Sequence, residues 1–159
     1  MLVSRHWLQK FFDTELPSGD MLTEVLTFHA FEIDGIQKVV APRRGDDASD
    51  EVLDVKVTPN RGHDCLSHRG VAKELSAILK IPFTHDPLQD TPILAPTTNA
   101  LSVVIEDPIL CKRYIAGFVR GVIVGPSPQW LKQNLEAVGQ RSINNVVDVT
   151  NLVLLELGQ

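Results

Sequence analysis

The sequence EVLDVKVTPNRGHDCLSHRGVAKELSAIL at residues 51–79 passes from a strand pattern to a helix pattern across one turn. Leu53, Val55 and Val57 alternate with polar residues, which is typical of a half-buried strand. A Pro-Asn-Arg-Gly turn ends the alternation, and apolar residues then recur at helical spacing. We therefore predict a strand, a turn and a helix over residues 66–79, which indicates an α+β protein. The expected core positions of this helix are Val71, Leu75, Ile78 and Leu79.

Two short amphipathic helices are predicted upstream of this strand. The first is expected to begin at Ser4 and the second at Asp20, because both residue types cap helix N-termini. A β-leaning run at residues 31–40, interrupted by Gly35, completes a small helix and strand module. Residues 42–51 have no apolar period and are expected to form a solvated loop. The predicted core positions are Trp7, Leu8, Phe11, Phe12, Leu22, Val25 and Leu26.

A proline-rich stretch separates this module from the rest of the chain. The prolines between residues 82 and 100 lie among polar residues without a period, which is typical of a linker. We place an N-terminal module at residues 1–90, the linker at residues 91–100 and a second module at residues 101–159.

The second module is predicted to begin with two strands and a helix. Apolar residues alternate over residues 101–105, and residues 114–124 are β-leaning although they contain glycine. Ser127-Pro128 favours a helix start, with the proline at the first helical position, and Gly139 favours its end. The stripe of this helix is expected to contain Trp130, Leu131, Leu135 and Val138.

The last segment has two competing patterns. Its β-branched residues favour a strand, whereas its apolar residues follow helical spacing. We predict a helix that begins near Ser142 and ends at Gly158, because length and period outweigh propensity here.

The amino-acid composition limits the classes of protein to which this chain can belong. Apolar residues make up 43% of the 159 residues, which is enough for a hydrophobic core. A net charge of −5 argues against a free-standing nucleic-acid binder, which usually has a basic face. Cys65 and Cys111 are too few for a disulfide framework, so we expect reduced thiols in a cytoplasmic protein. No apolar run reaches the roughly 20 residues of a membrane span, so we expect no membrane partner.

A group of histidines and a cysteine allows two other kinds of site, a metal site and a catalytic nucleophile. The candidates for a metal site are His63, Cys65, His68 and His85. Their spacing matches no established zinc pattern, so we expect no metal. A Cys65–His68 nucleophile pair would need a third orienting group and an oxyanion site. The simpler interpretation is that Asp64 or Ser67 caps the helix and that Cys65 packs in the core.

Two further groups have structural and functional interpretations. Trp7, Phe11 and Phe12 could form a stacking platform for bases, but their helical spacing favours a core or a subunit contact. Asn60 and Arg61 follow the strand and are expected to fix the turn through side-chain to backbone hydrogen bonds.

Three segments are similar to one known family. The first is FEIDGI at residues 31–36, after a two-helix start. The second comprises VTPNR, DCLS and GVAKE within residues 57–74, and the third comprises RSI, VVDVTN and LLELGQ within residues 141–159. Together they resemble the N-terminal part of the bacterial phenylalanyl-tRNA synthetase β subunit, up to the start of its α/β editing module. The resemblance is thinnest between residues 82 and 101.

Two departures from the family are present. Most bacterial members have an oligonucleotide-binding barrel inserted near Val40, where this chain has only a short loop. Any tRNA contact made by that barrel is therefore not implied here. The turn between Arg61 and Asp64 is also longer than in many members, so we expect a longer turn before the helix.

The resemblance implies a part of phenylalanine–tRNA ligase. It implies as partners an α subunit, in an (αβ)₂ heterotetramer, and phenylalanine tRNA. It also implies that ATP and Mg²⁺ serve the full enzyme, while this fragment binds no cofactor. The family's editing module hydrolyses tyrosine mischarged on that tRNA. The fragment is expected to end before a proline and a histidine that complete the pocket, and to be inactive alone.

Arg141 and Asn151 match positions of the editing pocket in the family. A guanidinium can stack on adenosine or bind phosphate oxygens, and an amide can pair with a carbonyl or hydroxyl of the aminoacyl ester. Without the resemblance, both would be interpreted as surface residues. Asp148 is expected to be a helix N-terminal charge, and we expect no catalytic residue in this fragment.

Two other functions are compatible with the residues. One is a free-standing tRNA-binding or trans-editing protein, for which the coding sequence would stop at Gln159. The other is a metal-dependent hydrolase, which would lose zinc after Cys65→Ser.

Overall fold

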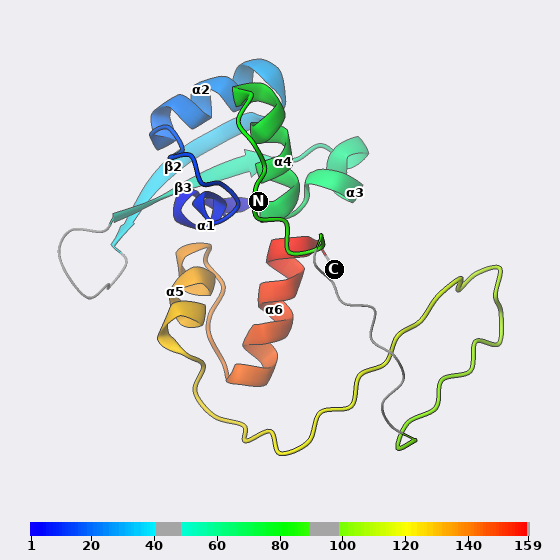
Figure 1. Ribbon diagram of the computed structural model, residues 1–159. Coiled ribbons are helices and arrows are strands. Elements are labelled where there is room, and N and C mark those ends of the chain that lie inside the picture. Colours follow the sequence, from blue (N-terminus) through cyan, green and yellow to red (C-terminus); the bar gives the residue numbers. More distant parts are fainter. Residues whose placement is uncertain (41–48, 90–98, 159) are drawn as a thin grey trace.

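The computed structural model describes residues 1–40, 49–89 and 99–158. Figure 1 shows a body of strands and helices, a pair of helices beneath it, and an extended segment that reaches away from both. The elements are β1 (Leu2–Ser4), α1 (Arg5–Gln9), α2 (Gly19–His29), β2 (Glu32–Val40), β3 (Ser49–Lys56), a 3₁₀ turn (Pro59–Arg61), α3 (Gly62–Cys65), α4 (His68–Leu79), α5 (Gln129–Ala137) and α6 (Asn145–Leu157).

The sheet confirms the predicted α+β class. Its strands are antiparallel in the order β1-β3-β2, so β3 lies at the centre and Leu2 faces Asp54 across the β1–β3 pair. The register of β2 against β3 shifts between Ile33 and Ile36. The interruption expected at Gly35 is therefore a bulge within one strand rather than a break.

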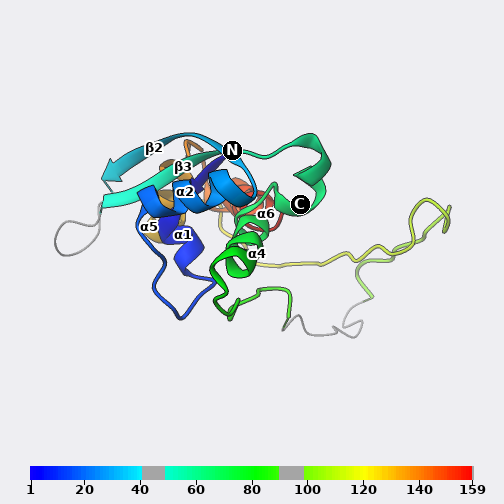
Figure 2. The ribbon, with the colours of Figure 1, turned by 90° about the horizontal axis from the view of Figure 1, so that it is seen from above.

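The core lies between this sheet and the helices α1, α2 and α4. Seen from above, these helices lie along the same side of β2 and β3 (Figure 2). The aromatic residues Trp7, Phe11 and Phe12 are at most 4% exposed, as predicted for core positions. Burying each such side chain stabilises the fold by roughly 1.5–3 kcal/mol. Their burial excludes the alternative of an exposed platform for bases.

Serine side chains cap three helices of this body. Ser4 accepts the N–H three residues further on, as predicted for α1. Ser18 caps α2, so the prediction of Asp20 as its cap was wrong, and Asp20 lies in the first turn, where its charge favours the helix dipole. Ser67 caps α4, and Leu66 lies outside that helix, which begins two residues later than predicted.

The predicted solvated loop at residues 42–51 overlaps the start of β3. Residues 49–51 belong to β3, so the loop prediction was wrong there, and residues 42–48 lie outside the described residues. The carboxylate of Asp50 accepts hydrogen bonds from the Ser4 hydroxyl and the His6 N–H. These bonds allow a charged residue in a buried strand position, which a polarity pattern cannot foresee.

The segment after the predicted linker forms neither predicted strand. Residues 90–98, which hold most of that linker, lie outside the described residues. Residues 101–105 and 114–124 run as unpaired chain (Figure 1). Large apolar side chains such as Ile123 are exposed along it. An alternating sequence forms a strand only when a neighbour satisfies its backbone groups. The described residues supply no such neighbour, so both strand predictions were wrong.

The helices α5 and α6 pack against each other. Pro128 is the N-cap of α5 rather than its first residue, and Gly139, with a φ of 77°, follows its end as predicted. The last segment is a helix, which confirms the choice of period over propensity. Its N-cap is Asn144 and not Ser142, and Gly158 ends it in the left-handed region at a φ of 83°.

The predicted stripe of α5 is only partly correct. Leu131 and Leu135 are buried and define its inner face, one turn apart. Trp130 is 54% exposed, so its prediction as a core residue was wrong. Adjacent helix positions point in directions about 100° apart, which turns the indole away from the face that Leu131 defines.

Candidate functional site

The turn that leads into α6 is organised by Asp148. Its fully buried carboxylate accepts hydrogen bonds from Ser127 Oγ at 2.5 Å, Ser142 Oγ at 2.6 Å and the Ile143 N–H at 2.8 Å. Burial alone would raise the pKa of Asp148, but the hydrogen bonds to its carboxylate lower the pKa by more than burial raises it. The pKa of Asp148 therefore lies below its ordinary value. The ionised carboxylate therefore fixes the turn. The sequence predicted a charge at this helix end but not its burial.

The two predicted pocket residues lie on either side of this carboxylate in the chain. Arg141 precedes the fixed turn, and its side chain is exposed. Asn151 lies on α6, about one turn beyond Asp148, and is half-buried. The backbone that presents Arg141 is thus held in place, while a role of either residue in a pocket stays a prediction.

Hydrogen bonds from Trp7 and His68 join α6 to the N-terminal body. The indole Nε1 of Trp7 donates to the Glu156 carboxylate at 3.0 Å. The ring Nδ1 of His68 lies 2.9 Å from the carbonyl oxygen of Leu155. Figure 1 shows the C-terminal end of α6 directly beneath α4, which agrees with these contacts. The orientation of the last helix is therefore set by α1 and α4.

His68 is a neutral structural histidine. Its Nε2 accepts the Ser4 N–H at 3.2 Å, so Nδ1 carries the hydrogen and donates it to Leu155. Its ring stacks on Trp7 with centroids 4.0 Å apart. Complete burial lowers the pKa of His68 to about 4, which keeps the ring uncharged near neutral pH.

Three of the four residues considered as metal ligands, His68, His85 and Cys65, have other contacts. Both ring nitrogens of His68 are hydrogen-bonded, and His85 Nε2 lies 2.7 Å from the Asp13 carboxylate. Cys65 is buried as predicted, and burial raises the pKa of its thiol to about 11. In the part of the chain that the structure describes, no group of three or more His, Cys, Asp or Glu side chains could hold a metal ion.

Arg61 binds carboxylates rather than the backbone. Its guanidinium contacts Asp64 at 2.9 Å and Glu74 at 2.7 Å, and it lies 5.4 Å from the ring of Phe31. These bonds lower the pKa of Asp64. The prediction of side-chain to backbone bonds by Arg61 was wrong, because residues 62–65 fold into α3 and bring Asp64 within reach of the guanidinium.

Comparisons with known proteins identify the family. A model of the B3/4 domain matches residues 110–159, the region that contains the Asp148 turn. The phenylalanine–tRNA ligase beta subunit of Rhodopirellula baltica is 42% identical over 163 aligned residues, which cover 100% of this chain. Those of Syntrophus aciditrophicus and Geobacter sulfurreducens are 51% and 50% identical over 71% and 69% of this chain. This chain belongs to the phenylalanine–tRNA ligase β-subunit family.

Membership of this β-subunit family confirms the resemblance that the three sequence segments indicated. The chain spans 22% of the length of the Rhodopirellula relative and 14% of the other two. This coverage fits the expectation of one part of a longer subunit. Among the described residues, no helix combines the length and apolar character needed to cross a membrane.

Proposed function

We propose that this chain contributes to phenylalanyl-tRNA aminoacylation as part of a ligase β subunit, and that residues 101–159 begin a tRNA-editing module. The supporting observation is the similarity to β subunits along the whole chain, together with the B3/4 match at residues 110–159. In the full cytoplasmic enzyme, an α subunit in an (αβ)₂ assembly performs the aminoacylation with ATP and Mg²⁺. Phenylalanine tRNA is the nucleic-acid partner, and this chain binds no cofactor itself.

Editing in this proposal is hydrolysis of the ester of mischarged tyrosyl-tRNA. Hydrolysis at a second site is needed where the aminoacylation site rejects an amino acid of nearly the same shape too weakly. The exposed guanidinium of Arg141 is available to stack on the terminal adenosine or to bind its phosphate. The amide of Asn151 is the second contact, to the ester or a hydroxyl. The Asp148 hydrogen bonds support this proposal, because a fixed backbone presents Arg141 in one position.

The N-terminal module at residues 1–90 has a positioning role in this proposal. The linker at residues 91–100 connects it to the editing module, but orientation comes from contacts. Trp7 and His68 bind the last turn of α6, and α6 follows the turn that presents Arg141. The N-terminal module therefore holds the editing module in a fixed orientation.

A complete β subunit assembled with its α subunit tests the role of Arg141. Arg141→Ala should slow deacylation of mischarged tyrosyl-tRNA by at least about tenfold, because a preorganised cationic contact is lost. Charging with phenylalanine should change by less than about twofold, since it takes place on the other subunit. Lys132→Ala on α5 is the matched control. Unchanged editing in Arg141→Ala, or an equal loss in both variants, would exclude Arg141 from the pocket.

An assay of the 159-residue chain alone tests whether this chain holds only part of the editing pocket. It should leave mischarged tyrosyl-tRNA intact, because only part of the pocket is expected on it. Released tyrosine is the measurement, with chain-free buffer as the reference. Rapid release would instead favour a free-standing trans-editing protein.

A further inference from the structure

Asn145 joins two segments of the chain at the start of α6. Its side-chain Nδ2 donates a hydrogen bond to the carbonyl oxygen of Ile123 at 2.9 Å, and its Oδ1 accepts the N–H of Gly125 at 3.1 Å. The backbone N–H of Asn145 donates to the carbonyl oxygen of Gly125 at 2.9 Å. One residue therefore satisfies three backbone groups in the segment that leads into α5.

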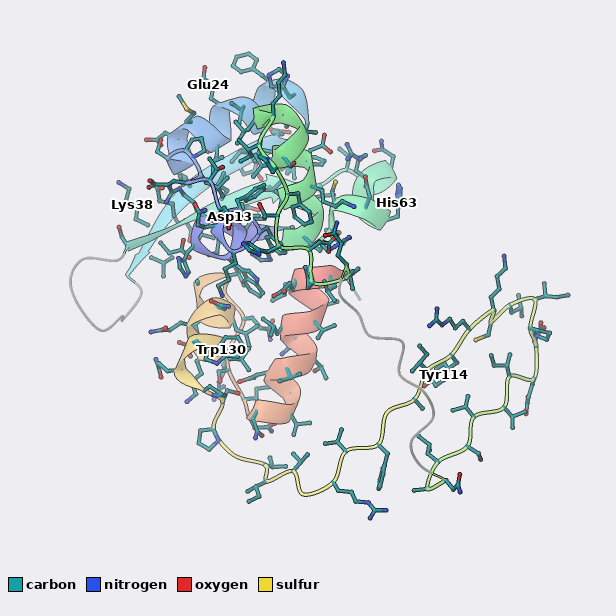
Figure 3. The ribbon with its side chains drawn as sticks, in the orientation of Figure 1. Asp13, Glu24, Lys38, His63, Tyr114 and Trp130 are labelled. Carbon is teal, nitrogen blue, oxygen red and sulfur yellow. The ribbon has the colours of Figure 1, made fainter. Side chains whose placement is uncertain are left out.

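These bonds need a donor and an acceptor in the same side chain. An asparagine amide offers both, whereas an aspartate offers only acceptors and an aliphatic residue offers neither. Tyr114 lies on the part of the segment that reaches away from the helices, whereas Trp130 lies on α5 (Figure 3). The Asn145 hydrogen bonds thus hold one end of an otherwise extended segment against α6.

The Asp148 carboxylate places this held end beside Arg141. Ser127 Oγ and Ser142 Oγ donate to the same oxygen of Asp148, so the residues before α5 lie next to the residues before α6. Ser142 directly follows Arg141, and Ser127 is two residues beyond the contacts of Asn145. The segment that Asn145 holds therefore borders the surface on which the Arg141 guanidinium is exposed.

Each of these two adjacent segments carries an exposed isoleucine. The side chain of Ile123 is 85% exposed, and that of Ile143 is 62% exposed. Exposed apolar groups on a fixed backbone mark a contact surface rather than a core. No Asp or Glu occurs between residues 108 and 135, and the carboxylate of Asp148 is fully buried, so little negative charge repels a phosphate here.

We propose that Asn145 is a positioning residue of the editing site. It holds Ile123 beside Arg141, and the Ile123 side chain packs against a planar ring at the 3′ end of the charged tRNA, either the terminal adenine or the aminoacyl side chain. A free segment would have to be ordered at each binding event, at a cost in conformational entropy that the Asn145 bonds remove. This inference rests on the editing function proposed above, and Asn145 acts only through Ile123.

A complete β subunit assembled with its α subunit tests this role through deacylation of mischarged tyrosyl-tRNA. Asn145→Ala and Ile123→Ser should each lower kcat/KM by about tenfold, as expected for loss of an apolar contact. The double variant should be no slower than the slower single variant, because both changes remove the same contact. A merely structural role of Asn145 would instead give losses that multiply.

Uncharged tRNA as a competitor identifies the ring. It keeps the terminal adenine but lacks the aminoacyl side chain. Weaker inhibition of Ile123→Ser by uncharged tRNA would assign the contact to the adenine. Unchanged inhibition, together with a raised KM for tyrosyl-tRNA, would assign the contact to the aminoacyl ring.

Ser18→Ala is the matched control for stability. It removes the N-cap of α2, so it should lower the melting temperature but change deacylation by less than about twofold. Hydrogen exchange of the 159-residue chain checks the contact itself, because the Gly125 amide should exchange faster in Asn145→Ala and not in Ser18→Ala. If Asn145→Ala does not fold, Asn145→Asp carries the same expectation for deacylation. The aspartate keeps an acceptor and suits the first turn of a helix, but it lacks the donor to Ile123.

Three outcomes would overturn the proposal. These are unchanged deacylation in Ile123→Ser, equal losses in Asn145→Ala and Ser18→Ala, and losses that multiply in the double variant. In each case the unaltered enzyme still deacylates tyrosyl-tRNA, so the editing function stands. An unaltered enzyme without this activity would remove the editing function and this inference together.

Discussion

The indole nitrogen of Trp7 donates a 3.0 Å hydrogen bond to the carboxylate of Glu156, 149 positions away in the sequence. Trp7 is fully buried, so its N–H has no access to water as a replacement partner. The bond connects the beginning of the described chain to its last helix. It therefore reports whether the two modules are docked.

Glu156→Leu should lower the free energy of unfolding by about 1–3 kcal/mol, because the indole N–H would remain buried without an acceptor. Glu156→Gln keeps an acceptor oxygen and should have a clearly smaller effect. Urea unfolding of both variants at neutral pH measures the difference. Equal stability of the two variants would show that the hydrogen bond contributes nothing.

His68 should make the protein sensitive to mild acid. Burial lowers its pKa from 6.5 to about 4, so the unfolded chain takes up a proton in a range where the folded chain does not. The stability from this histidine is complete above pH 6.5 and falls as the pH drops toward about 4. The loss should reach roughly 2–3 kcal/mol near pH 4.5, measured by urea unfolding across this range.

Two variants isolate this pH effect. His68→Gln should flatten the dependence of stability on pH between 6.5 and about 4.5, although it weakens the fold at neutral pH. His63→Gln, at an exposed histidine, should leave the dependence unchanged. A steep dependence that persists in His68→Gln would assign it to other groups.

Asp148→Ala should loosen the turn before α6, because the hydroxyls of Ser127 and Ser142 and the Ile143 N–H lose their shared acceptor. The melting temperature should fall, and the amide of Ile143 should exchange faster with solvent. Asp107→Ala is the matched control, since its carboxylate accepts backbone N–H bonds in the exposed segment. A similar fall in melting temperature for both would argue against the buried network.

Gly70 should not tolerate a side chain. A Cβ atom at this position would lie 2.0 Å from the carbonyl oxygen of Asp64, where α3 crosses α4. Gly70→Ala should therefore destabilise the fold by about 3 kcal/mol or more. Gly62→Ala, where a Cβ meets nothing within 4 Å, should be neutral or slightly stabilising. Thermal unfolding of the two variants makes the comparison.

The helices could be predicted from the sequence because their signals are local. Ser4 as a cap and Gly158 as a stop act on the turn beside them, and apolar spacing identifies the face that packs. The central strand was predictable for the same reason. Residues 101–105 and 114–124 were not, since strand formation depends on a distant partner that the local sequence does not contain.

The features of the candidate site could likewise be predicted from the sequence only in part. Arg141 and Asn151 were identified through a family resemblance, which is information that periodicity alone does not hold. The burial of Asp148 was missed because its serine partners lie in two separate loops. Trp130 was misassigned because a helical stripe does not show which flanking residue borders a cleft.

Residues 101–124, which lie between α4 and α5, are mostly exposed and form no helix or strand. The direct contacts of α6 with Trp7, His68 and α4 hold the two modules together, and residues 101–124 keep them on one chain and so at a high effective concentration. A cut within residues 101–124 should therefore leave two polypeptides that can reassociate. The two modules would then behave as complementary fragments that are normally joined in one chain.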